Sequence, residues 1–81
     1  MKTLKVIVEH AGNNLSAYID GVPVFTVGDS LEEIKANINE AIEFYLEDNP
    51  KPVVALTGKY ELIFQFDPQS LLNYYSRIFS Y

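Results

Sequence analysis

Residues 28–50 read GDSLEEIKANINEAIEFYLEDNP, and this stretch decides the fold because it contains a helical pattern with both ends marked. Its apolar positions recur at the three-and-four spacing of one helical face; they are Leu31, Ile34, Ile38, Ala41, Ile42 and Tyr45. Ser30 can cap the first turn while Glu33 returns the bond as a capping box, and Pro50 closes the other end. The sequence predicts an amphipathic helix from Leu31 to near Asn49.

The residues before this helix alternate between apolar and polar side chains as strands do. The pattern predicts three strands, at residues 4–9, 15–19 and 22–27. Asp20-Gly21 fits a two-residue hairpin turn between the second and third strands. Pro23 lies inside the third strand and cannot donate a ladder hydrogen bond, so we expect that strand at an edge of the sheet.

After the helix, residues 60–66 alternate again and predict a fourth strand. A strand that returns after a helix most simply lies parallel to the first strand. Asp67-Pro68 is a typical opening of a second helix. The expected fold is α+β in the order β-β-β-α-β-α, with residues 1–66 forming one domain and residues 67–81 a C-terminal helix.

The composition excludes several classes of protein. With 48% hydrophobic residues the chain should fold, and a net charge of −5 argues against direct binding of nucleic acid. No long apolar run or signal-peptide pattern is present, so we expect a cytoplasmic protein without a membrane contact. The absence of cysteine excludes disulfides, a thiol nucleophile and a cysteine-ligated zinc site.

The acidity belongs to the helical segment. Residues 30–50 contain six acidic side chains and one lysine, so their local charge of −5 equals that of the whole chain. A helical wheel places Glu33, Asn37, Glu40, Phe44 and Glu47 in one stripe outside the apolar face. Phe44 either packs over the core edge or under the 50–52 connection, or it is an aromatic anchor in an acidic surface that suits a basic partner.

Catalytic chemistry has little support in the sequence. His10 is the only histidine, and we expect it in an exposed turn. The isolated glycines lack the spacing of a phosphate-binding loop. Glu9, Asp20 and Asp29 could converge on a divalent metal as in a metal-dependent nuclease, or could be ordinary loop residues. We therefore expect no catalytic residue, metal or cofactor, and keep the nuclease as an alternative.

Two other surfaces are candidates for contacts with a partner. Seven of the 11 aromatic residues lie within residues 60–81. We expect part of this cluster, together with Ile78, to pack against another chain or a further domain. The residues concerned are Tyr74, Tyr75, Ile78, Phe79 and Tyr81. Alternatively, the domain is a non-catalytic oligomerisation or peptide-binding module that uses the sheet face left uncovered by the helix, including Lys5, Ile7 and Tyr18.

Three segments together resemble the HicB antitoxin family. They are residues 5–19 (KVIVEHAGNNLSAYI), residues 28–42 (GDSLEEIKANINEAI) and residues 66–75 (FDPQSLLNYY). The resemblance implies a partial RNase H-like fold with three antiparallel strands, a crossover helix and a fourth strand beside the first. It also implies that the protein binds and blocks a small basic HicA-type toxin, an mRNA-cleaving ribonuclease. We expect it to mask the toxin sterically and electrostatically, as an oligomer. Our candidate contacts with that toxin are Glu33, Glu40, Phe44 and Glu47.

Two departures limit what this resemblance implies. Members of the family carry a DNA-binding module after the region that corresponds to residues 66–79, whereas this sequence stops at Tyr81. We therefore expect operator binding to be absent or impaired in these residues. Glu9 is the only acid in the first predicted strand, so the fold does not imply RNase H activity.

Overall fold

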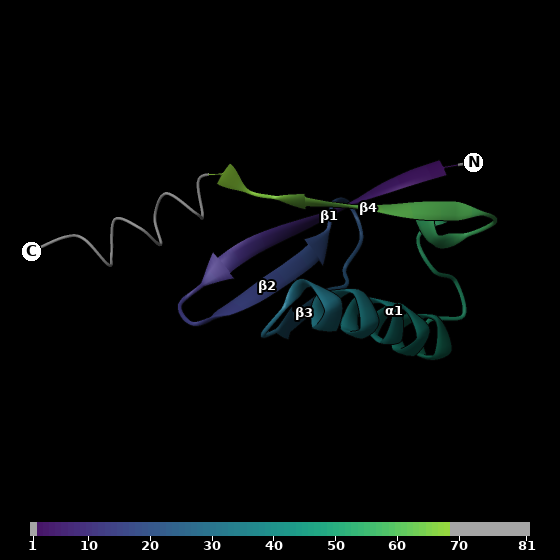
Figure 1. Cartoon of the computed structure of the whole chain (residues 1–81). Coiled ribbons are helices and arrows are strands. Elements are labelled where there is room, and N and C mark those ends of the chain that lie inside the picture. Colours follow the sequence, from purple (N-terminus) through teal and green to yellow (C-terminus); the bar gives the residue numbers. More distant parts are fainter. Residues whose placement is uncertain (1, 69–81) are drawn as a thin grey trace, which may run out of the picture.

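The computed structural model describes residues 2–68, which form a four-stranded sheet and one long helix (Figure 1). The elements, in chain order, are β1 (Lys2–Ala11), β2 (Asn14–Ile19), β3 (Phe25–Gly28), α1 (Leu31–Asp48), the short 3-10 helix η1 (Val54–Leu56) and β4 (Tyr60–Phe66). The α+β order predicted for these residues is confirmed. The predicted C-terminal helix lies almost entirely outside the described residues.

The strands lie in the order β3-β2-β1-β4. β1 is antiparallel to β2, β2 is antiparallel to β3, and β4 is parallel to β1 because α1 carries the chain across the sheet. The predicted topology of three antiparallel strands, a crossover helix and a fourth strand parallel to the first is confirmed. β3 and β4 are the two edges of the sheet (Figure 1).

The third strand begins later than its alternating pattern predicted. A hydrogen bond of 3.1 Å from the Val22 amide to the Ile19 carbonyl closes a turn in which Gly21 has a φ of 79°. The strand starts only at Phe25, so the predicted two-residue hairpin is wrong and residues 20–24 form the connection. After this turn the Val24 carbonyl accepts a 3.2 Å hydrogen bond from the Ile19 amide, so the backbone returns to β2 just before the strand begins. The predicted edge position of this strand is confirmed.

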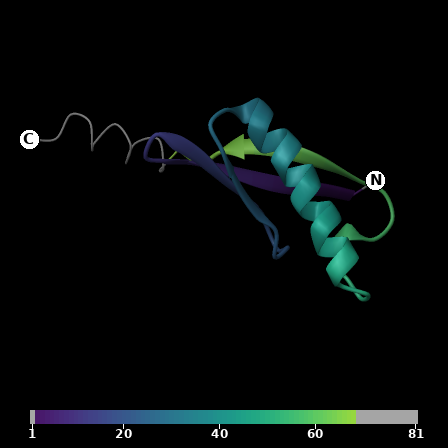
Figure 2. The ribbon, with the colours of Figure 1, turned by 90° about the horizontal axis from the view of Figure 1, so that it is seen from below.

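One face of the sheet packs against α1 and forms the core. The buried side chains are Leu4, Val6, Val8, Ala17, Ile19, Val22, Val24, Ile34, Ile38, Ile42 and Leu56. The predicted apolar face of the helix is confirmed, since Leu31, Ala41 and Tyr45 are partly buried against the same cluster. α1 approaches β3 and β2 more closely than β1 or β4. It runs obliquely across the strands, as Figure 2 shows.

Both ends of α1 follow the local sequence. The Glu33 amide donates to Ser30 Oγ over 3.2 Å, which confirms the predicted cap. In an ordinary capping box the Glu33 carboxylate would accept a hydrogen bond from the Ser30 amide. Here it accepts one from the preceding amide, that of Asp29, over 3.3 Å. At the other end, Asn49 Nδ2 donates to the Tyr45 carbonyl over 2.7 Å, and Asn49 is extended because Pro50 follows it.

A close approach joins the end of β3 to the first turn of α1. A Cβ atom at Gly28 would lie 3.1 Å from Glu33 Cβ and 3.3 Å from the Ile34 amide nitrogen. Glycine therefore lets the helix start directly against the strand that precedes it. No helix within residues 2–68 has the length and apolarity needed to cross a membrane.

Candidate partner-binding surfaces

The outer side of α1 is acidic and exposed. Its exposed acidic residues are Glu32, Glu33, Glu40, Glu43, Glu47 and Asp48. Lys35 Nζ lies 5.5 Å from the centre of the Phe64 ring, so the one basic side chain of the helix is directed towards β4. The last turn carries Glu47 and Asp48 and no basic residue. Negative charge at a helix C-terminus costs about 0.3–1 kcal/mol, so helix stability does not explain these acids.

The predicted stripe on α1 divides into two parts. Glu33 holds the Asp29 amide at the start of the helix. Asn37 Nδ2 donates to the Val27 carbonyl over 2.9 Å and ties the helix to β3. These two residues thus support the fold, whereas Glu40, Phe44 and Glu47 are exposed in the second half of the helix. Glu33 is exposed as well, so all four predicted contact residues are accessible; we call Glu40, Phe44 and Glu47 the acidic-aromatic surface.

Phe44 is not buried in the core or beneath the 50–52 connection. Its side chain is 57% exposed, although it lies on a helix that packs against a sheet. The chain that follows the helix contacts Tyr45 and not Phe44, because the Val53 amide donates to Tyr45 Oη over 3.2 Å. Glu40 and Glu47 lie one turn before and one turn after Phe44 on the helix surface. Phe44 is therefore an accessible ring between two carboxylates.

The sheet face opposite α1 carries a second candidate surface. Lys5 and Tyr18 are exposed there and Ile7 is half-buried, as predicted for an uncovered face. The register places Ile7 between Tyr18 on β2 and Gln65 on β4. Sequence reasoning did not include three further apolar residues of this face, which are Phe25, Val27 and Ile63. The sequence could have identified them, because they alternate along their strands with residues that face the core.

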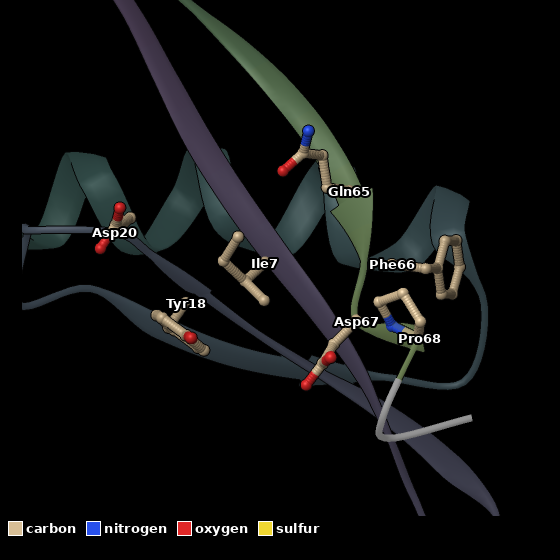
Figure 3. A pocket seen from close by; sticks show the side chains of 7 residues that line it. All are labelled: Ile7, Tyr18, Asp20, Gln65, Phe66, Asp67 and Pro68. Atoms are coloured by element: carbon tan, nitrogen blue, oxygen red, sulfur yellow. The ribbon is translucent and has the colours of Figure 1, made fainter. Parts of the chain in front are cut away.

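A cavity of about 350 Å³ lies on this uncovered face (Figure 3). Its lining residues are Ile7, Tyr18, Asp20, Gln65, Phe66, Asp67 and Pro68. In Figure 3, Ile7 lies between Tyr18 and the end of β4, and α1 lies behind the sheet. The cavity has an apolar floor and two carboxylates, which suits a short peptide more than an anionic ligand.

The three acids of the alternative nuclease site do not converge. Glu9 lies opposite Ser16, near the β1–β2 hairpin. Asp20 follows the other end of β2, where its amide donates to the Lys5 carbonyl over 2.9 Å. Glu9 and Asp20 are therefore separated by about 13 Å along the sheet, at ~3.3 Å per residue. No group of three histidine or acidic side chains within residues 2–68 could hold a metal ion.

His10 lies in β1 and not in the predicted exposed turn. The strand continues to Ala11, and the imidazole is half-buried with its ring centre 5.6 Å from that of Phe66. The pairing of β1 with β2 extends to Ala11 and Asn14, which leaves only residues 12–13 for the hairpin loop.

The aromatic residues proposed for oligomer contacts, from Tyr74 to Tyr81, lie outside the described residues. Comparison of the chain with protein-family models, curated proteins and solved structures finds no significant match.

Proposed function

We propose that this domain is an antitoxin, which binds and masks a small basic HicA-type mRNA-cleaving ribonuclease through the acidic-aromatic surface of α1. The family resemblance of residues 5–19 and 28–42 suggests the class of partner. The observation that carries the proposal is the exposed Phe44 ring between Glu40 and Glu47, on a segment that holds a net charge of −5.

The chemistry of RNA binding supports this choice of surface. A small ribonuclease holds the phosphate backbone of its substrate with lysine and arginine side chains. Carboxylates on a rigid helix compete for the same basic surface and raise the rate of encounter with it. Phe44 supplies an apolar anchor that can be desolvated at the centre of the contact, while the glutamates form its polar rim.

In this proposal the chain acts by steric and electrostatic masking. It is not an enzyme, needs no cofactor and makes no direct contact with nucleic acid. It functions in the cytoplasm, where the toxin meets mRNA, and it acts as an oligomer.

A cleavage assay tests the proposal. A purified HicA-type toxin is incubated with RNA and increasing amounts of the 81-residue chain, and we expect cleavage to stop near stoichiometric addition. The double variant Glu40→Lys and Glu47→Lys should inhibit poorly. A control with the same change in net charge, Glu9→Lys and Asp20→Lys, should inhibit normally because it alters neither α1 nor β4. Full inhibition by the α1 variant would contradict the proposal.

A second candidate function is peptide binding at the uncovered sheet face. The cavity beside Ile7 and the 40% exposure of Tyr18 favour it. This alternative predicts that Tyr18→Ala abolishes partner binding while reversal of Glu40 and Glu47 leaves it unchanged. The same assay with these variants therefore separates the two surfaces.

A further inference from the structure

The two edges of the sheet differ in how they are protected against pairing with another strand. β3 is only four residues long, and Pro23 precedes it closely. The Val27 carbonyl is occupied by the side chain of Asn37 at 2.9 Å. Short length, a nearby proline and an occupied backbone group are the usual protections of an edge strand.

β4 has none of these protections within the described part of the chain. It is seven residues long, reads YELIFQF, and contains no proline, no glycine and one charged residue, Glu61. The Asp67 amide donates to the Val8 carbonyl over 2.8 Å, so the backbone groups of the odd-numbered residues of β4 point towards β1. Those of the even-numbered residues, including Leu62 and Phe64, therefore point away from β1, towards the open edge. Ile63 and Phe66 are 43% and 44% exposed. Because α1 lies nearest β3 and β2, the apolar side chains of β4 are incompletely covered.

We propose that β4 pairs antiparallel with β4 of a second copy of this chain, about a two-fold axis at Ile63. The strand sequence is self-complementary in this register. Ile63 faces its own copy at the axis, and the flanking pairs are Leu62 with Phe64, Glu61 with Gln65, and Tyr60 with Phe66. Every apolar residue meets an apolar residue, and each glutamate meets a neutral amide.

Hydrogen bonding selects the same register. Leu62 and Phe64 direct their backbone groups outwards, and this register pairs them with each other, as an antiparallel ladder requires. A shift of one residue would pair outward groups with inward ones. Moving the axis to Leu62 leaves Gln65 and Phe66 without partners in β4, and moving it to Phe64 places Pro68, which has no amide proton, opposite Tyr60.

The charge distribution also permits this dimer. The acidic helix packs more closely on β3 and β2 than on β4, and only its basic residue, Lys35, has a ring contact with β4. Two copies joined at β4 therefore keep their strongly negative segments apart and leave both acidic-aromatic surfaces exposed. The proposed dimer does not depend on the antitoxin function, because it requires no toxin.

Disulfide trapping tests the axis directly, because the 81-residue chain contains no cysteine. Residues that face each other in a non-hydrogen-bonded antiparallel pair have Cα atoms about 4.5 Å apart, which a disulfide can span. We expect Ile63→Cys to form a disulfide-linked dimer under mild oxidation. Val27→Cys is the matched control, since Val27 is similarly exposed at 47% but lies on β3, and it should remain unlinked.

Substitutions at Gln65 test the register by sedimentation equilibrium of the full chain. Gln65→Lys faces Glu61 of the other copy and should tighten the dimer, whereas Gln65→Glu should weaken it. Since two symmetric pairs change, we expect dissociation constants that differ about tenfold between these variants. Asn39→Lys and Asn39→Glu, on the exposed surface of α1, match their net charges and should differ much less.

Three results would overturn the proposal. One is a monomer at all concentrations. Another is trapping of V27C in preference to I63C. The third is a difference between the Gln65 variants no larger than that between the Asn39 variants.

Discussion

The Asn37 side chain donates a 2.9 Å hydrogen bond to the backbone carbonyl of Val27 and so joins α1 to the edge strand β3. Asn37 lies on the same helical stripe as Glu40 and Phe44, but it faces the sheet edge and is partly buried. This bond fixes the helix beside β3 and satisfies a carbonyl that would otherwise be available to another strand. It therefore separates the structural part of the stripe from the part available to a partner.

Removal of this bond should destabilise the domain. We expect Asn37→Ala to lower the free energy of unfolding by about 1–2 kcal/mol, because it leaves the Val27 carbonyl without that donor. Asn39→Ala is the control, since Asn39 Nδ2 bonds only within the helix, to the Lys35 carbonyl at 3.0 Å, and alanine favours helix. Urea denaturation measures both variants, and equal losses would contradict the structural role of Asn37.

Charge reversal at the two ends of α1 should change stability in opposite directions. Glu32 lies in the first turn, where a negative charge is favourable, and Glu47 lies near the C-terminal end, where it is unfavourable. Glu32→Lys should therefore lower stability and Glu47→Lys should raise it, each by about 0.3–1 kcal/mol at low salt. Thermal unfolding tests this pair. If Glu47→Lys also lowered stability, the carboxylate would have a structural role that we have not assigned.

Phe44 and Tyr45 should separate binding from folding. Phe44→Ala should change stability by less than about 0.5 kcal/mol, as for other exposed positions, and weaken toxin binding by more than about 1 kcal/mol. Tyr45→Phe should cost about 1 kcal/mol of stability, because Tyr45 Oη accepts the Val53 amide, while toxin affinity stays unchanged. Titration calorimetry measures the toxin affinity, and urea denaturation measures the free energy of unfolding. If Phe44→Ala lowered stability and left toxin affinity unchanged, Phe44 would not be the anchor.

Local sequence signals predicted the helix and the fourth strand well. Ser30 and Pro50 mark the helix ends with side-chain and backbone chemistry that acts within a few residues. The bounds of β4 coincide with residues 60–66 as predicted, and its parallel pairing follows from the helical crossover. These features depend on short-range interactions, which a sequence pattern reports directly.

The third strand could not be placed by its pattern. Val22 and Val24 alternate with Pro23 because their side chains are buried, although both residues lie before the start of β3 and only the Val24 carbonyl bonds to β2, through the Ile19 amide. The alternation of apolar and polar residues shows which side chains face the core, but it does not show which backbone amides bond to a neighbouring strand. The wrong length of the loop that begins at Asp20-Gly21 and the wrong placement of His10 have the same origin, since strand ends depend on tertiary pairing.

The candidate site was only partly predictable for a related reason. A helical wheel finds the acidic stripe, but it cannot show that Asn37 meets β3 or that Phe44 avoids the 50–52 connection. Both depend on how α1 packs on the sheet. The self-complementary pattern of β4 is visible in the sequence, but it acquires meaning only when the strand is known to be an edge.

The rate of association between this chain and a HicA-type toxin tests the central claim most directly. Stopped-flow measurements at low and high salt should compare the unmodified chain with the Glu40→Lys and Glu47→Lys double variant. The account predicts much slower association of the variant at low salt and a smaller difference at high salt, because screening weakens steering by exposed charges. Equal association rates of the two proteins at both salt concentrations would contradict it.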